Sequence, residues 1–169
     1  FDEMRKDNIW LLLYGNVGSG KTYIACCIAN SIITEYSYNV KVKNLSQILN
    51  DLQAGGFKLD RNEYIDQITD ATLLILDDFG IERNTEYALE QLYNVINARY
   101  LKEKPTIITT NINFSDLEKE QSDIMLGRIY SRIIEMCLPL RIVGRDRRKL
   151  IFKDKMNKAK LLLDNDIKI

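Results

Sequence analysis

Histidine is missing from this sequence of 169 residues, and proline, cysteine and tryptophan are scarce. Without histidine there is no Ser-His-Asp catalytic triad, no Cys-His catalytic pair, no HExxH zinc site and no histidine phosphorelay. The longest uninterrupted apolar run, Ile9–Tyr14, falls far short of the roughly 20 residues that cross a bilayer, so we expect no membrane partner. The formal net charge is zero, so any basic binding site must be a local one.

The small numbers of cysteines and glycines limit which cellular compartment and which domain organisation we expect. The three cysteines form no CxxC pair and are an odd number in a chain without a signal peptide, which favours a reduced cytoplasmic setting. We interpret Cys26, Cys27 and Cys137 as small core residues. No repeat or linker interrupts residues 1–169, which we expect to form one domain. Because the chain begins with phenylalanine, we also expect it to be the C-terminal domain of a longer protein.

Short apolar runs alternate with longer segments of helical period, which predicts an α/β fold with a mainly parallel sheet. The predicted strands are Ile9–Tyr14, Val40–Lys43, Leu73–Leu76, Thr106–Thr110 and Leu138–Val143. Two helical stripes should face the sheet, formed by Ile24, Cys27, Ile28 and Ile32, and by Leu89, Leu92, Tyr93 and Ile96. Further helices are predicted from an Asn44 or Ser46 cap through Leu52, from Met125 to Glu135, and from Asp146 to Leu163.

A glycine-rich segment follows the first predicted strand and fits the pattern G-x-x-x-x-G-K-[ST]. Its glycines allow backbone N–H groups to surround a phosphate, and the next helix adds its positive N-terminal end. Lysine in this pattern reaches the β- and γ-phosphates, and the hydroxyl after it binds Mg²⁺. The predicted nucleotide-binding residues are therefore Gly15, Asn16, Val17, Gly18, Ser19, Gly20, Lys21, Thr22 and Tyr23.

Polar side chains follow two later strands. Asp77 and Asp78 end an apolar strand, as in the Walker B motif that lies beside a P-loop. Strand alternation would point them in different directions, so that Asp77 holds the metal with Thr22 and Asp78 polarises the attacking water. Asn111 ends the next strand and could position that water. Catalytic roles are thus predicted for Lys21, Asp78 and Asn111.

Two groups of basic residues remain. Arg128 and Arg132 lie four residues apart on one predicted helix, either as surface charges or as an arginine finger that acts on an adjacent subunit. Residues 141–160 carry nine basic and two acidic side chains. This strip is either a solvated helix or a surface that contacts phosphates of DNA or of the nucleotide.

The motifs GNVGSGKT, LLILDDFG, ITTN, LGRIYSRI and GRDRR, in this order, resemble the AAA+ ATP-binding domain of the DnaC/DnaI helicase loaders, with the IstB transposition helpers as close kin. The resemblance covers essentially the whole chain. It implies a P-loop αβα sandwich whose five parallel strands have the order 5-1-4-3-2, with a reduced or absent helical lid. It also implies that Asn111 is the sensor-1 residue, Arg132 the trans-acting finger with Arg128 as its companion, and Arg148 a phosphate sensor. Asp78 stands where many AAA+ proteins have glutamate, which leaves Glu82 as a weaker alternative base.

What the resemblance implies about function is an ATP-dependent helicase loader. Such a protein binds ATP or ADP with Mg²⁺ and single-stranded DNA, associates with itself through the finger, and grips the replicative helicase through an N-terminal region that this chain lacks. It is an ATPase, weak as an isolated domain. Three alternatives stay open: an IstB-like helper of a transposase, a P-loop kinase of nucleotides or small molecules, and a nucleotide-gated module that hydrolyses almost nothing.

Overall fold

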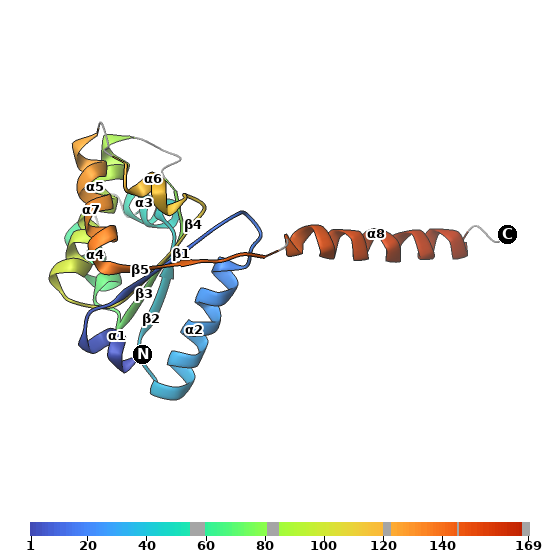
Figure 1. The fold of residues 1–169 in the computed structure, drawn as a ribbon, viewed down its shortest axis with the longest axis horizontal. Coiled ribbons are helices and arrows are strands. Elements are labelled where there is room, and N and C mark those ends of the chain that lie inside the picture. The colour runs from blue at the N-terminus through green and yellow to red at the C-terminus, as the bar shows by residue number, and fades with distance from the viewer. Residues whose placement is uncertain (55–59, 81–84, 120–122, 145, 167–169) are drawn as a thin grey trace.

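Five parallel strands lie between two layers of helices in the computed structural model, which describes residues 1–54, 60–80, 85–119, 123–144 and 146–166 (Figure 1). The strands are β1 (Trp10–Tyr14), β2 (Val40–Lys43), β3 (Leu73–Phe79), β4 (Thr106–Thr110) and β5 (Cys137–Arg141). The helices are α1 (Asp2–Lys6), α2 (Lys21–Tyr36), α3 (Leu45–Ala54), α4 (Arg61–Thr69), α5 (Glu86–Leu101), α6 (Phe114–Leu117), α7 (Ile124–Met136) and α8 (Arg147–Asp166).

The strand order is β2-β3-β4-β1-β5, which read from the other edge is the predicted 5-1-4-3-2. Every neighbouring pair is parallel; Leu12, for example, pairs with Ile108 of β4 and Pro139 of β5. The predicted α/β sandwich of the P-loop type is therefore confirmed. Since all strands run the same way, the ends of β1, β3 and β4 meet at one edge of the sheet.

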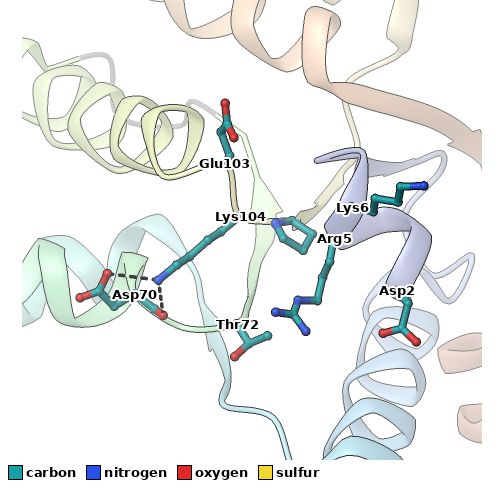
Figure 2. Close-up of a pocket in the computed structure, with 8 residues that line it drawn as sticks. Asp2, Arg5, Lys6, Asp70, Thr72, Glu103 and Lys104 are labelled. Atoms are coloured by element: carbon teal, nitrogen blue, oxygen red, sulfur yellow. Dashed lines mark hydrogen bonds and ion pairs between the residues drawn. The ribbon is translucent and has the colours of Figure 1, made fainter.

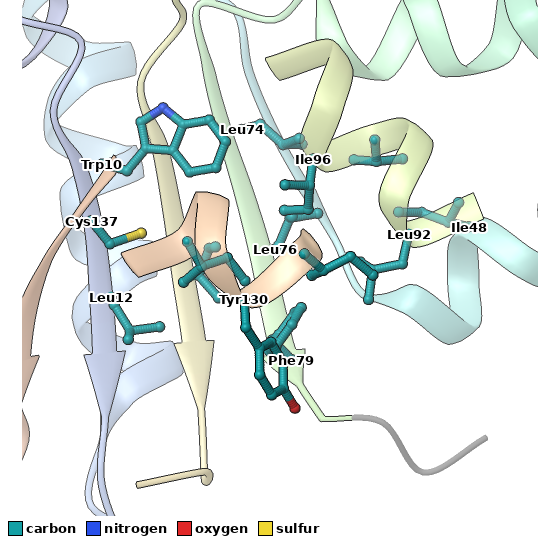
Figure 3. Close-up of a cluster of buried hydrophobic side chains, with 14 of the residues drawn as sticks. Trp10, Leu12, Ile48, Leu74, Leu76, Phe79, Leu92, Ile96, Tyr130 and Cys137 are labelled. Carbon is teal, nitrogen blue, oxygen red and sulfur yellow. The ribbon is translucent and has the colours of Figure 1, made fainter. Parts of the chain in front are cut away.

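The central strands β1, β3 and β4 are covered on both faces. β1 and the first four residues of β3 are apolar, and all five residues of β4 are buried although three of them are threonines. One face packs against α3, α4, α5 and α7, with Trp10, Leu12, Leu74 and Leu76 among its fully or almost fully buried side chains (Figure 3). The other face packs against α2, where Leu13 and Ile75 contact small residues of that helix. The central sheet is thus anchored on both sides, which fixes the positions of its strand ends.

The buried face of α2 differs from the predicted stripe. Its buried apolar residues are Ala25, Ala29 and Ile32, and Ile24 and Ile28 are only partly buried. Cys26 and Cys27 are exposed, so their interpretation as core residues is wrong. The helix turns its small alanines toward the sheet, which places the two cysteines on other sides of the helix. Cys137 is buried as expected, and burial raises the pKa of its thiol to about 12.

Several element boundaries also differ from the predictions. β3 continues through the two aspartates to Phe79, and β5 begins at Cys137 and ends at Arg141. Asn44 rather than Ser46 caps α3. Its Oδ1 accepts a hydrogen bond from the Gln47 backbone amide at 2.8 Å, and the Asn44 backbone amide donates one to Gln47 Oε1 at 3.1 Å.

The last helix, α8, projects away from the body of the protein (Figure 1). It matches the charged surface helix predicted from Asp146 to Leu163, although it begins at Arg147 and extends to Asp166. Its described side chains are exposed, including the apolar Ile151 and Phe152. In the part of the chain that the structure describes, no helix is both long and apolar enough to cross a membrane.

One charged side chain is fully buried under the sheet. Arg99 of α5 donates hydrogen bonds from Nη1 to the carbonyl oxygens of Thr69 and Ala71, at 2.9 and 2.6 Å. Its Nη2 donates to the carbonyl of Pro105, and its Nε donates to Thr106 Oγ1 at 3.0 Å. Burial lowers its pKa, an effect that Asp70 opposes. Arg99 therefore joins α4, α5 and the loops that lead into β3 and β4.

Replacing Arg99 with methionine should destabilise the fold, because several buried carbonyl groups lose their donors. We expect a loss of about 3 kcal/mol in the free energy of unfolding, measured by urea denaturation. Arg128→Met, on the exposed side of α7, is the matched control and should stay within about 0.5 kcal/mol of the parent. Equal losses for the two variants would contradict the role given to Arg99.

Candidate functional site

The loop between β1 and α2 has the backbone shape of a phosphate cradle. Gly15, Gly18 and Gly20 have φ angles of 145°, 77° and 100°, a region that side chains rarely allow. Gly20 is also the N-cap of α2, so the positive end of a 16-residue helix points into this loop. The glycine spacing read from the sequence thus corresponds to a real conformational need.

The segment that leaves β5 packs directly on this loop. The Ile142 amide donates to the Tyr14 carbonyl at 2.7 Å, and a Cβ on Gly15 would collide with the Ile142 carbonyl oxygen. In the same way, a Cβ on Gly18 would collide with the carboxylate of Asp146. That carboxylate accepts a hydrogen bond from the Arg148 amide at 3.0 Å and so caps α8. The loop and the start of α8 are therefore in contact.

Lys21 lies at the centre of the site and is 8% exposed. Its Nζ donates to the carbonyls of Gly15 and Asn16, both at 3.0 Å, and to Asn111 Oδ1 at 2.7 Å. Burial lowers the pKa of Lys21, the carboxylates of Asp78 and Asp77 oppose that shift, and Arg148 adds to it. The ammonium group is thus held by neutral oxygens, and its charge is available to an anion.

Asp77 is fixed by two hydroxyl groups. Its Oδ1 accepts a hydrogen bond from Thr22 Oγ1 at 2.8 Å and another from Thr109 Oγ1 at 2.7 Å. The pairing of Thr22 with Asp77 brings together the two predicted metal ligands. Thr109 was missed by the sequence reasoning, because a threonine inside a β-strand has no distinguishing signal until the register places it beside Asp77.

Asp78 adopts a left-handed conformation with φ of 53°, which is uncommon for a residue other than glycine. The register with β4 shifts between Leu76 and Phe79, and the Asp78 amide donates to Thr109 Oγ1 at 2.9 Å. Strand alternation predicts that neighbouring aspartates point apart. This irregularity instead lets both aspartates line one cavity, where Asn111 Nδ2 donates to Asp78 Oδ1 at 3.3 Å.

These groups enclose a cavity of about 630 Å³, lined by Val17, Gly18, Gly20, Lys21, Thr22, Tyr23, Asp77, Asp78, Thr109, Asn111, Arg148 and Ile151. Among the described residues, the Ser19 hydroxyl is the one buried polar side-chain atom without a hydrogen-bond partner. Glycines, a helix N-terminus and a buried lysine suit a triphosphate. Thr22 and Asp77 present the oxygen ligands that Mg²⁺ prefers. The site therefore fits a magnesium nucleotide, and Arg148 also lines the cavity.

The predicted finger does not lie in this cavity. Arg132 and Arg128 line a separate hollow of about 520 Å³ between α5 and α7. The guanidinium carbon of Arg132 is 4.8 Å from the ring centre of Tyr93 and 5.4 Å from that of Tyr100. Neither arginine is among the residues that line the Lys21 cavity. Glu82, the alternative base, lies outside the described residues.

Another hollow, of about 440 Å³, opens at the amino ends of the strands (Figure 2). It is lined by Asp2, Arg5, Lys6, Asp70, Thr72, Glu103, Lys104 and Pro105. Its charges are mixed, and Lys104 is already bonded to the carbonyl and the carboxylate of Asp70, at 2.8 and 3.3 Å. Ligands of parallel sheets gather at the opposite, carboxyl ends of the strands. We therefore place the functional site at the Lys21 cavity.

Comparisons with known proteins identify the family. The model of the family described as IstB-like ATP binding protein matches residues 3–159. The chain is 25% identical to the replicative helicase loader DnaI of Bacillus subtilis over 82% of this chain and 47% of that protein. It is 33% identical to the phage-like element PBSX protein XkdC of the same organism over 80% of this chain and 49% of that protein. The chain thus spans about half the length of these curated relatives.

A solved structure of DnaI is also similar, with a TM-score of 0.66 and 25% identity over 82% of this chain and 72% of that one. The resemblance to the DnaC/DnaI group with IstB kin, inferred from the motifs, is confirmed by these matches.

The glycine at position 18 provides a test of the cradle. We expect Gly18→Ala to weaken ATP binding at least tenfold in isothermal titration calorimetry. The backbone at position 18 is left-handed, which alanine disfavours, and the new Cβ would collide with Asp146. Gly80→Ala is the control, because its Cβ meets no atom within 4 Å. Unchanged affinity in a folded Gly18→Ala protein would contradict the proposed cradle.

Proposed function

Because the chain belongs to the family of IstB-like ATP binding proteins, we propose that it is an ATP-dependent loader of the replicative helicase. The observation that carries the proposal is the convergence of Lys21, Thr22, Asp77, Asp78 and Asn111 on one cavity beside the glycine loop. The family supports a role in ATP binding, and the cavity supplies the chemistry that such a role requires.

In the proposed complex the loop from Gly15 to Tyr23 surrounds the phosphates of ATP or ADP. Lys21 turns from the loop carbonyls toward the β- and γ-phosphates. Thr22 and Asp77 hold Mg²⁺, which would neutralise part of the phosphate charge. Arg148, at the start of α8, adds a second positive charge at the rim.

Hydrolysis would depend on Asp78 and Asn111. The hydrogen bond between them fixes the carboxylate of Asp78 and leaves its other oxygen for a water molecule. Arg132 of an adjacent copy would supply the positive charge that stabilises the transition state. Its position in a hollow separate from the Lys21 cavity supports this role. A missing partner copy would then leave the isolated domain with little ATPase activity.

The loading function is supported by the helicase loader DnaI among the relatives. In this proposal ATP favours one arrangement of neighbouring copies on single-stranded DNA, and hydrolysis releases the helicase. Since the chain spans about half the length of these curated relatives, contact with the helicase is proposed for the whole protein and not for these residues alone. The basic residues 141–160 are the first candidates for the DNA contact.

A transposase helper is the second candidate, and the family name favours it. The two candidates differ in the nucleic acid they should bind. We expect a loader to bind single-stranded DNA at least tenfold more tightly than duplex DNA in the presence of ATP, measured by fluorescence anisotropy at fixed salt. Equal affinity, or preference for the duplex, would contradict loading and support the transposase helper.

The role of Lys21 gives the most direct mutational prediction. Lys21→Ala removes charge-assisted hydrogen bonds to the phosphates, for a loss of about 2 to 3 kcal/mol, or roughly 30- to 150-fold in ATP affinity. Lys41→Ala is the control, because Lys41 donates a hydrogen bond to the Gln67 carbonyl and is not among the residues that line the cavity. A Lys21→Ala protein that binds ATP as tightly as the parent would contradict the P-loop assignment. Transfer of phosphate from ATP to a nucleoside would instead support the alternative that the protein is a P-loop kinase.

A further inference from the structure

Arg132 has an unusual environment for an arginine on a helix surface. Two tyrosines of α5, seven residues apart and so on the same side of that helix, present their rings to its guanidinium group, with ring centres 4.8 and 5.4 Å from Cζ. Aromatic rings attract a guanidinium through its flat face. The N–H groups lie in the plane of the guanidinium, so contact with ring faces leaves them available to oxygen acceptors.

No carboxylate among the described residues forms an ion pair with Arg132. Glu135, one helical turn further along α7, is the obvious candidate for such a pair. Its Oε1 instead accepts a hydrogen bond from the Tyr100 hydroxyl at 3.0 Å. Tyr100 therefore contacts the arginine through its ring and engages the nearest acid through its hydroxyl. Within the described part of the chain, the Arg132 guanidinium therefore has no carboxylate as its ion-pair partner.

We propose that Tyr93 and Tyr100 are positioning residues that hold the Arg132 guanidinium in place for the triphosphate bound by an adjacent copy of the chain. This inference rests on the proposed function, in which Arg132 acts in trans. A free arginine side chain loses conformational entropy when it engages a phosphate. The two rings and the helix backbone restrict that freedom beforehand, and a neutral aromatic surface does so without competing for the charge.

The size of the effect follows from the strength of such contacts. A cation–π contact at a partly exposed site contributes about 0.5 to 1 kcal/mol, so loss of one ring should lower turnover about two- to fivefold. Loss of both rings should lower it about tenfold. These are smaller effects than loss of the finger itself, which costs about a thousandfold or more in related phosphate-transfer systems.

The experiment mixes two inactive forms of the protein and measures ATP turnover with single-stranded DNA present. The receiving form, Arg132→Ala, keeps Asp78 but lacks the finger. The donating form, Asp78→Asn, keeps Arg132 but lacks the proposed base. Only a mixed interface contains one complete site, so the mixture should recover activity.

Tyr93→Leu with Tyr100→Leu is then introduced into one form at a time. In the donating form the pair should reduce the recovered turnover about tenfold, and Tyr93→Phe with Tyr100→Phe should retain most of it because the rings remain. The receiving form lacks the Arg132 guanidinium, so replacing both tyrosines with leucine there cannot affect its position. The recovered turnover should therefore persist. A role in general folding would instead reduce recovery from either form.

The matched control in the donating form is Tyr87→Leu, which removes a third tyrosine of α5, one whose ring faces Arg61 at 5.7 Å rather than Arg132. It should leave the recovered turnover unchanged. Full recovery with the leucine pair in the donating form, or equal loss in both forms, would overturn the positioning role while the trans finger stands. No recovery in the unmodified mixture would overturn the trans finger, and the positioning role with it.

Discussion

The ammonium group of Lys21 depends on contacts that only a parallel sheet can bring together. It reaches two carbonyls of the loop after β1 and the amide of Asn111 after β4, 90 residues along the chain. Those partners meet because β1 and β4 are adjacent and run the same way, with Leu13 opposite Thr109. The buried strands and the two helical layers maintain that register. The packing that stabilises the core therefore also sets the geometry of the site.

The second constraint is the irregular end of β3. A regular strand would turn Asp77 and Asp78 to opposite faces, and only one of them could serve the cavity. The left-handed backbone at Asp78, held by the Thr109 hydroxyl, lets both carboxylates line it. The same hydroxyl also donates to Asp77. Backbone strain at such a position is typical of functional sites, where the surrounding structure maintains it. The loop contacts with Asp146 extend this rigid region to the start of α8.

The sequence predicts most of the architecture because the patterns involved are local. Short apolar runs between helical segments indicate a parallel sheet, and the glycine spacing indicates the cradle around Lys21. Other features depend on register and could not be predicted. The orientation of α2, which exposes Cys26 and Cys27, is decided by which small residues fit against the sheet. Thr109 and the buried Arg99 are indistinguishable from ordinary polar residues until the strands and loops are assembled.

The most direct test of this account is a crystal structure of the protein with a non-hydrolysable ATP analogue and Mn²⁺ in place of Mg²⁺, in which anomalous scattering locates the metal. The account predicts one manganese peak within coordination distance of Thr22 Oγ1, or joined to Asp77 through one water, with the γ-phosphate beside Lys21. A triphosphate bound elsewhere, or a metal remote from both residues, would contradict it.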